Sequence, residues 1–141
     1  MIRDFKKEDS NQVMKIWLET NRKTHSFIEQ EYWKKNEKEV KKAILDAQVY
    51  VYEEDKIVVG FVGIVDGYIA GIFVEEKKQN KGIGKQLIEE CKRRYTKLNL
   101  KVYEKNKRAI QFYQREDFKT RNKKLEKDTQ EIELFMEWNR K

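Results

Sequence analysis

Six consecutive residues, Gln79-Asn80-Lys81-Gly82-Ile83-Gly84, have the composition of a phosphate-binding turn. They follow an apolar segment and precede a segment with helical periodicity. Backbone N–H groups at the start of a helix carry a partial positive charge and can hold an anion where no side chain blocks the approach. All six glycines of the chain lie between positions 60 and 84, so backbone freedom is concentrated around this turn. We therefore expect an anionic, nucleotide-like ligand at this loop.

The commoner sites for nucleotides, metals and nucleophilic catalysis do not fit the sequence. A Walker loop would need a glycine at position 79 and a Ser or Thr at position 86, and glutamine stands at both. A Rossmann fingerprint would need a third glycine where Leu87 stands. His25 and Cys91 are the only residues of their types, which excludes a structural zinc site. The only serines are Ser10 and Ser26, and neither lies in a nucleophile elbow.

Length and composition indicate one domain, residues 1–141. A chain of this length can bury roughly 68% of its unfolded surface without disulfides or metals. Charged residues make up 40%, but 38% apolar and 12% aromatic residues argue against disorder. We see no signal-peptide core and no apolar run approaching about 18 residues, so we expect a cytoplasmic protein that does not enter the membrane. The single cysteine, Cys91, lies on an apolar helical face, where packing is its expected role.

The net charge is +7, from 32 Lys and Arg against 25 Asp and Glu. A basic surface can bind nucleic acid, but here the positive residues are interspersed with acidic ones and form no aromatic-laced stripe. We therefore do not expect nucleic acid as the main partner. The charge fits a lysine-rich surface that attracts a polyanionic ligand.

The pattern of apolar residues and turn formers predicts an α/β (α+β) fold built on a central sheet. Strands are expected at residues 2–5, 48–53, 57–66, 68–74, 99–103, 118–125 and 132–138, and helices at about 10–20, 31–47, 82–95 and 106–117. Residues 21–29 are expected to form a loop, and 31–47 to form one helix or two short ones. Asp117 is expected to take the left-handed conformation that usually falls to glycine at a helix end. The predicted sheet is mixed and mostly antiparallel, with about seven strands, about four flanking helices and one parallel βαβ step at the glycine loop.

A second block follows about two dozen residues after the glycine loop: Asn106-Lys107-Arg108-Ala109-Ile110-Gln111-Phe112-Tyr113, then Phe118. Together with the Gln-x-x-Gly-x-Gly loop and its flanking strand and helix, this block resembles the GNAT superfamily of acyl-CoA-dependent N-acetyltransferases. The order of elements matches over nearly the whole chain. Within the superfamily the sequence is most similar to a small bacterial YjaB-like branch, on the residues Thr24-His25-Ser26-Phe27, Tyr32-Trp33, 69–74 and 102–106.

The resemblance implies that acetyl-CoA is the acyl donor and that no metal takes part. The pantetheine arm would pair with a strand backbone like an added strand, and an N–H there would stabilise the developing oxyanion. Asn106 would bond the pantetheine amides, cap the following helix, or do both. Tyr113 would protonate the departing thiolate as general acid, with core packing beside Phe112 as the alternative role. The implied cofactor-binding residues are Gln79, Asn80, Lys81, Gly82, Ile83, Gly84 and Lys85 for the pyrophosphate and Ile72, Phe73 and Val74 for the arm.

The resemblance supplies no general base. Some relatives carry a carboxylate on one of two strands, but those positions hold Lys101 and Tyr68 here. His25 is the only imidazole, and its ordinary pKa of about 6.5 would suit a base or an acceptor-site contact, although a lone loop histidine is also commonly structural. Our candidates for the acceptor site are His25, Phe27, Trp33 and Tyr68, with aromatic core packing as the alternative.

We therefore expect transfer of an acetyl group from acetyl-CoA to a primary amine of a small molecule or a protein, by direct attack in a ternary complex. A noncatalytic acyl-CoA-binding or sensor module, which keeps the loop and lacks the base, is the first alternative. Weak association with nucleic acid through the basic surface is the second. The protein would act as a monomer or a homodimer, and acceptor loops vary too freely on such a scaffold for the sequence to specify the amine.

Overall fold

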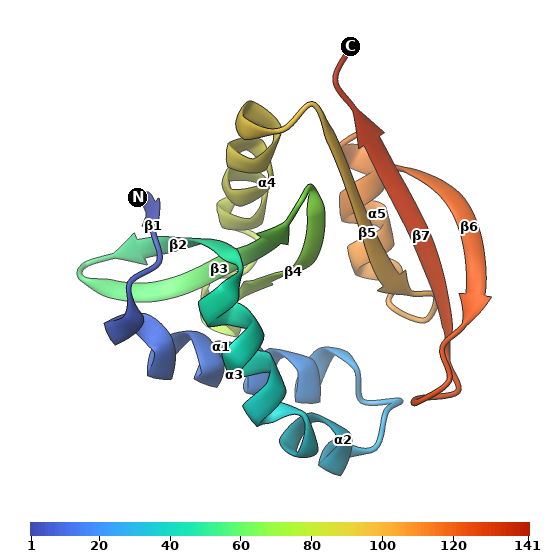
Figure 1. The fold of residues 1–141 in the computed structure, drawn as a ribbon, viewed down its shortest axis with the longest axis horizontal. Coiled ribbons are helices and arrows are strands. Elements are labelled where there is room, and N and C mark those ends of the chain that lie inside the picture. Colours follow the sequence, from blue (N-terminus) through green and yellow to red (C-terminus); the bar gives the residue numbers. More distant parts are fainter.

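The computed structural model describes all 141 residues and contains one open sheet of seven strands (Figure 1). The strands lie in the order β1-β2-β3-β4-β5-β7-β6. All neighbouring strands are antiparallel except β4 and β5, which are parallel. This confirms the mixed, mostly antiparallel sheet with one βαβ step. The strands are β1 (Ile2–Asp4), β2 (Gln48–Glu54), β3 (Ile57–Val65), β4 (Tyr68–Val74), β5 (Lys97–Tyr103), β6 (Lys119–Leu125) and β7 (Ile132–Asn139).

Helices pack on both faces of this sheet and enclose two hydrophobic cores. Successive strand residues point to opposite faces. Val49 and Val51 of β2 therefore join the core that contains the apolar side of α1, whereas Tyr50 between them joins the core that contains α4 and α5. The helices are α1 (Ser10–Thr24), α2 (Gln30–Lys35), α3 (Glu37–Asp46), α4 (Ile83–Arg94) and α5 (Lys107–Arg115), with single 3-10 turns at Lys7–Asp9 and Glu76–Lys78.

One helical boundary differs from the sequence-based expectation, and a second segment takes one of the two forms expected for it; a polar side chain explains each. α1 runs on to Thr24 rather than ending near position 20, because Asn21 is buried and donates its amide to the Trp17 carbonyl at 2.9 Å. Asn21 thus continues the inner face of the helix instead of stopping it. The segment 31–47 divides at Asn36, whose side-chain amide donates to the Tyr32 carbonyl at 2.6 Å. The division gives five helices in place of about four.

β4 and β5 part soon after they meet. They pair only through Tyr68 with Asn99 and Ile69 with Leu100. Opposite β3 the register of β4 shifts at this point, which leaves Ala70 as an extra, unpaired residue. A bulge of this kind bends and twists a strand. From Gly71 to Val74, β4 therefore has a strand partner on the β3 side only, and no strand pairs with its other edge.

The end of α5 is fixed by a Schellman motif. Phe118 donates its N–H to the Tyr113 carbonyl at 2.9 Å, and Asp117 donates to the Gln114 carbonyl at 3.0 Å. The rings of Tyr113 and Phe118 pack at 5.7 Å, which is the hydrophobic contact typical of the motif. Asp117 has φ of 70°, which confirms its expected left-handed conformation.

Replacing Asp117 by glycine should stabilise the protein, because glycine adopts a positive φ without the steric cost that Asp bears. We expect Asp117→Gly to raise the free energy of unfolding by about 0.5–1 kcal/mol, measured by urea denaturation. Asp128→Gly is the matched control, since Asp128 lies in a turn and is not among the residues with positive φ. An equal gain in both variants would contradict this explanation.

Candidate functional site

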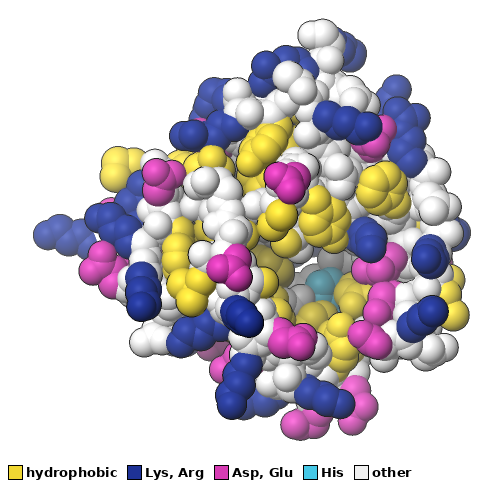
Figure 2. All heavy atoms as spheres, in the orientation of Figure 1, with side chains coloured by type: hydrophobic (Ala, Val, Ile, Leu, Met, Phe, Trp, Pro, Cys, Tyr) yellow, Lys and Arg dark blue, Asp and Glu magenta, His cyan; other side chains and the backbone are white.

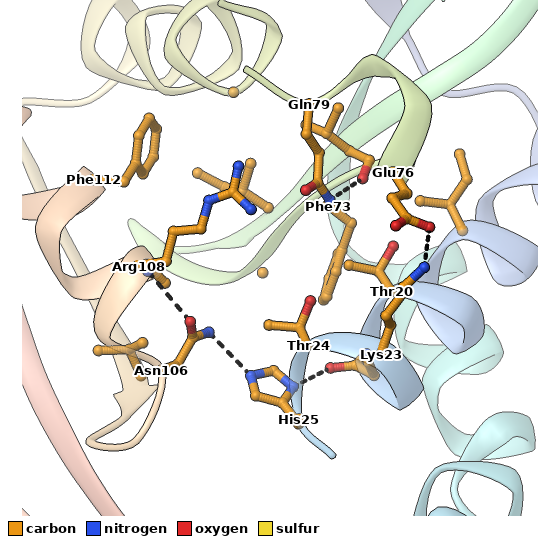
Figure 3. A pocket seen from close by; sticks show the side chains of 18 of the residues that line it. Thr20, Lys23, Thr24, His25, Phe73, Glu76, Gln79, Asn106, Arg108 and Phe112 are labelled. Carbon is orange, nitrogen blue, oxygen red and sulfur yellow. Dashed lines mark hydrogen bonds and ion pairs between the residues drawn. The ribbon is translucent and has the colours of Figure 1, made fainter. Parts of the chain in front are cut away.

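A cavity of about 1670 Å³ opens where β4 and β5 part. Its walls come from α1, the free edge of β4, the loop before α4 and the start of α5. Figure 2 shows the hollow from one side, with the only histidine at its bottom and both acidic and basic side chains around its rim. In Figure 3, side chains from these separate elements point toward the same space.

The loop before α4 exposes backbone amides to the cavity. The first helical hydrogen bond runs from Gln86 N–H to the Gly82 carbonyl, so the amides of Ile83, Gly84 and Lys85 precede the helical ladder. Gly82 has φ of 83° and open space where a Cβ would stand. The side chain of Gln79 donates to the Val74 carbonyl at 2.9 Å and ties the loop to the end of β4. These features fit a diphosphate bound by backbone N–H groups, with the rest of a long ligand along β4.

Basic side chains surround this end of the cavity. Lys77, Lys85 and Lys107 line it and take part in no ion pair, so their charge is available to a polyanion. Arg108 at the start of α5 donates to the Asn80 side chain at 2.6 Å, which links α5 to the loop across the mouth. Lys23 of α1 and Glu76 form a second link at 2.5 Å. Both pairs are exposed, so each contributes little to stability and can open for a ligand.

The structure brings most of the predicted cofactor-binding residues to this cavity. Lys81 is the exception, since it lies on the loop but not on the cavity wall. Of the predicted acceptor-site residues, His25 and Trp33 line the cavity, whereas Phe27 and Tyr68 do not. Phe27 instead packs edge-on against His25 with ring centroids at 5.6 Å. The predicted residues on the wall are Ile72, Phe73, Val74, Gln79, Asn80, Gly82, Ile83, Gly84, Lys85, Asn106 and Tyr113.

His25 joins the two sides of the cavity through hydrogen bonds of fixed direction. Asn21 gives its amide N–H to a backbone carbonyl, so its oxygen must accept from His25 Nδ1, at 2.9 Å. At the other end Asn106 Oδ1 accepts from the Ala109 N–H, so its nitrogen must donate to His25 Nε2, at 3.1 Å. His25 is therefore the neutral tautomer with its proton on Nδ1. The chain of bonds connects α1 to the N-cap of α5 (Figure 3).

Burial lowers the pKa of His25 from 6.5 to about 4. The imidazole is therefore neutral near pH 7, and its one lone pair already accepts from Asn106. It would have to release Asn106 before it could accept a proton. This arrangement favours a positioning role for His25 over that of a base. Asn106 caps α5 and still has one amide hydrogen free for a ligand, so both of its expected roles are compatible.

Tyr113 lines the cavity from α5 and is 9% exposed. Burial raises its pKa well above the usual value of 10, and the nearby Cys91 thiol and Tyr68 phenol add to the effect. The hydroxyl therefore stays protonated at neutral pH and can donate. Cys91 itself is fully buried, and burial raises the pKa of its thiol to about 12, which confirms packing as its role.

Comparison with known proteins decides the family. A model of the acetyltransferase (GNAT) domain matches residues 45–120. YiaC of Escherichia coli, a peptidyl-lysine N-acetyltransferase, is 36% identical over 140 residues, which cover 98% of this chain and 96% of YiaC. The chain belongs to the GNAT acetyltransferase family. As a member of this family it is an acetyl-CoA-dependent N-acetyltransferase, and acetyl-CoA supplies the activated acetyl thioester.

Other GNAT relatives agree with this assignment. YjaB of E. coli, also a peptidyl-lysine N-acetyltransferase, is 27% identical over 119 residues, or 84% of this chain and 81% of YjaB. The solution structure of apo YjaB superposes with a TM-score of 0.87 at 24% identity, over 100% of this chain and 98% of that one. The YncA structure from Salmonella typhimurium, which contains acetyl-CoA, has a TM-score of 0.69 at 16% identity, over 99% of this chain and 92% of that one. These likenesses confirm the GNAT fold.

The structure also shows what this GNAT domain lacks. No group of three or more His, Cys, Asp or Glu side chains is placed to hold a metal ion. None of the helices is both long enough and apolar enough to cross a membrane.

Sequence reasoning missed many residues of the cavity wall, among them Ala70, Tyr103 and Glu133. Ala70 is the bulged residue of β4, and no local signal marks a bulge there. Tyr103 ends β5 with its ring 5.1 Å from that of His25. Glu133 lies beside Tyr103 on β7. The sequence does contain a signal for Glu133, because the apolar residues Ile132, Leu134 and Met136 alternate along the strand and residue 133 must therefore point to the other face.

The neutral, buried His25 should make the protein less stable in acid. Its pKa in the folded state lies below 6.5, so the unfolded chain takes up the proton first and stability falls as the pH drops from 6.5 toward 4. We expect the difference in unfolding free energy between wild type and His25→Gln to shrink by about 2 kcal/mol from pH 7 to about pH 4.5, by urea denaturation. Glutamine keeps one donor and one acceptor without titrating. A difference that does not change with pH would contradict the assignment of a neutral imidazole.

A side chain at position 84 should weaken coenzyme A binding without harming the fold. A Cβ there would meet the Phe112 ring at 3.6 Å, an ordinary contact, and alanine favours a helix over glycine. It would also crowd the amides at the helix start. We expect Gly84→Ala to keep or raise the melting temperature and to raise the Kd for coenzyme A about tenfold or more, by calorimetry.

Gly63→Ala is the control for this change, because its Cβ would meet only Val49, at 3.9 Å. It should leave the Kd for coenzyme A unchanged. Unaltered binding in Gly84→Ala would mean that the phosphates do not lie against this loop.

Proposed function

We propose that this protein acetylates the side-chain amine of lysine residues in proteins. The observation that carries the proposal is its 36% identity over nearly the whole length to YiaC, a peptidyl-lysine N-acetyltransferase. YjaB has the same printed activity and is also similar in sequence. In this proposal the lysine side chain is the primary amine, and it enters the part of the cavity that His25 and Trp33 line.

The form of the cavity supports a single amine on a flexible side chain. Aromatic rings of His25, Trp33 and Tyr103 line the cavity, and His25 stacks on Trp33 at a centroid distance of 5.5 Å and lies edge-on to Tyr103. Such rings can pack along the methylene groups of a lysine and can present their faces to its ammonium group.

In this proposal each half of the cavity has a separate task. The amides of Ile83, Gly84 and Lys85 hold the pyrophosphate of acetyl-CoA, and the free edge of β4 orients its pantetheine arm. Tyr113 donates its proton to the departing sulfur, since its raised pKa keeps the hydroxyl protonated. The amine attacks directly in a ternary complex, because the one thiol of the chain is buried and cannot act as an acyl carrier.

The two alternative functions are not favoured by the comparisons, because the similar curated proteins are N-acetyltransferases. A sensor module would keep the loop without turnover, and a nucleic-acid protein would have no use for a cavity of this shape. We further propose a cytoplasmic location, where an enzyme that consumes acetyl-CoA finds its donor and its protein acceptors.

Removing the Tyr113 hydroxyl tests the proposed chemistry. With a blocked lysine peptide and acetyl-CoA, we expect Tyr113→Phe to lower kcat by about 10²-fold, because the thiolate loses its proton donor. The Kd for coenzyme A should stay the same, and thiol release and peptide mass report the reaction. Tyr50→Phe is the control, since Tyr50 is equally buried but is absent from the cavity wall. Full activity of Tyr113→Phe would exclude this phenol as the acid, and a wild type that acetylates no lysine peptide would exclude the proposed function.

A further inference from the structure

Three of the five carboxylates on the cavity wall make no ion pair or side-chain hydrogen bond, and only one of the three, Glu133, lies beside the aromatic wall. Five glutamates line the wall: Glu19, Glu75, Glu76, Glu116 and Glu133. Glu76 pairs with Lys23, and Glu116 pairs with Lys92. Glu19 and Glu75 stand at the α1–β3 end, where they also border a second, smaller cavity. Glu133 alone lies beside the aromatic wall, partly buried, and its carboxylate makes neither an ion pair nor a hydrogen bond.

The strand register places Glu133 and Tyr113 on opposite faces of the sheet. On β7, Leu134 belongs to the core that contains Tyr113 and α5. Glu133 precedes it and points to the other face, as does its cross-strand partner Tyr103, which packs against the α1 core. Both Tyr113 and Glu133 nevertheless line the same cavity, since the cavity passes between β4 and β5 where they part.

The surroundings of Glu133 suit a carboxylate that meets a cation only when substrate is bound. Burial raises its pKa above 4.5; Glu126 reinforces the shift and the Lys101 ammonium opposes it. Lys101 forms no ion pair with the Glu133 carboxylate or with any other residue. The phenols of Tyr32 on α2, Tyr68 on β4 and Tyr103 on β5 face the same region, and all three have a raised pKa and stay neutral. Glu133 is thus a carboxylate on the cavity wall that lies beside three neutral phenols and has no ion-pair partner of its own.

We infer that Glu133 is a catalytic residue that binds the acceptor ammonium and takes one of its protons, in the reaction proposed above. Glu133 would thus be the general base, a role to which the family resemblance assigned no residue. It rests on the position of the carboxylate in the cavity, on the face opposite Tyr113, and on the absence of any other partner.

The proton and bond changes balance with these two residues. The ammonium group of the acceptor gives one proton to the Glu133 carboxylate and becomes a neutral amine. Its lone pair forms a C–N bond with the thioester carbonyl carbon, and the C–S bond breaks with its electron pair on sulfur. Tyr113 gives its proton to that sulfur, and the second proton of the new amide nitrogen replaces the one lost from Tyr113 through water. The proton on Glu133 returns to solvent, so one proton is released in each turnover.

The test is Glu133→Gln, which keeps the shape and removes the charge and the basicity. With a blocked peptide carrying one lysine, we expect kcat/KM at pH 7 to fall about 10- to 100-fold, with an unchanged Kd for coenzyme A. Activity should recover toward pH 10, because the lysine amine then loses its proton in solution. Glu133→Asp should restore part of the loss.

Glu137→Gln is the matched control, since Glu137 lies on the same strand and the same face but pairs with Lys97 and Arg121 outside the cavity. It should keep the wild-type kcat/KM. A Glu133→Gln enzyme within twofold of wild type, with the same pH profile, would overturn the inference.

A binding measurement separates this inference from the proposed function and needs no turnover. In calorimetry on the protein saturated with coenzyme A, wild type should prefer the lysine peptide to the same peptide with norleucine, and Glu133→Gln should lose that preference. Equal preference in both proteins overturns the role of Glu133 alone. If wild type neither binds nor acetylates lysine peptides, the proposed function fails and this inference fails with it.

Discussion

The separation of β4 from β5 is the constraint on which the site depends. A sheet normally satisfies its backbone groups through both neighbours, and a buried edge without partners is costly. Here the bulge at Ala70 turns β4 away after two residue pairs, so the edge that follows stays unpaired and faces the cavity. A ligand that presents amides along this edge supplies the missing partners. The same separation lets groups from both faces of the sheet reach one space.

The cavity also has to be held in shape, because its two walls belong to different parts of the chain. The hydrogen bonds from Asn21 through His25 to Asn106 connect α1 with the start of α5. The side-chain amides of Asn21 and Asn106 are each oriented by a hydrogen bond to a backbone group. The imidazole between them therefore has one tautomer and one orientation. At the far end of α5 the Schellman motif around Asp117 holds the turn that carries Tyr113. The helix is thus anchored at both ends.

Local chemistry in the sequence was enough to predict the glycine loop, the Asn106 cap and the left-handed Asp117. Each of these depends on neighbours within a few residues. The bridge from His25 to Asn106 joins positions 81 residues apart, and only the tertiary fold brings them together. The position of Glu133 also depends on the tertiary fold. The alternation of apolar residues predicts which face of the strand Glu133 is on. It reaches the cavity only because β7 lies between β5 and β6, which places Glu133 beside Tyr103.

The charges of the protein are separated in a way that suits a polyanionic donor and a cationic acceptor. The net charge of +7 would repel a lysine-bearing partner if it were spread evenly. Unpaired lysines instead gather at the loop end of the cavity, and the unpaired Glu133 lies at the aromatic end. Acetylation turns the ammonium into a neutral amide, so the product loses the attraction that would bring the substrate to Glu133. In the proposed reaction, the contact with Glu133 that favours binding of the lysine therefore does not hold back release of the product.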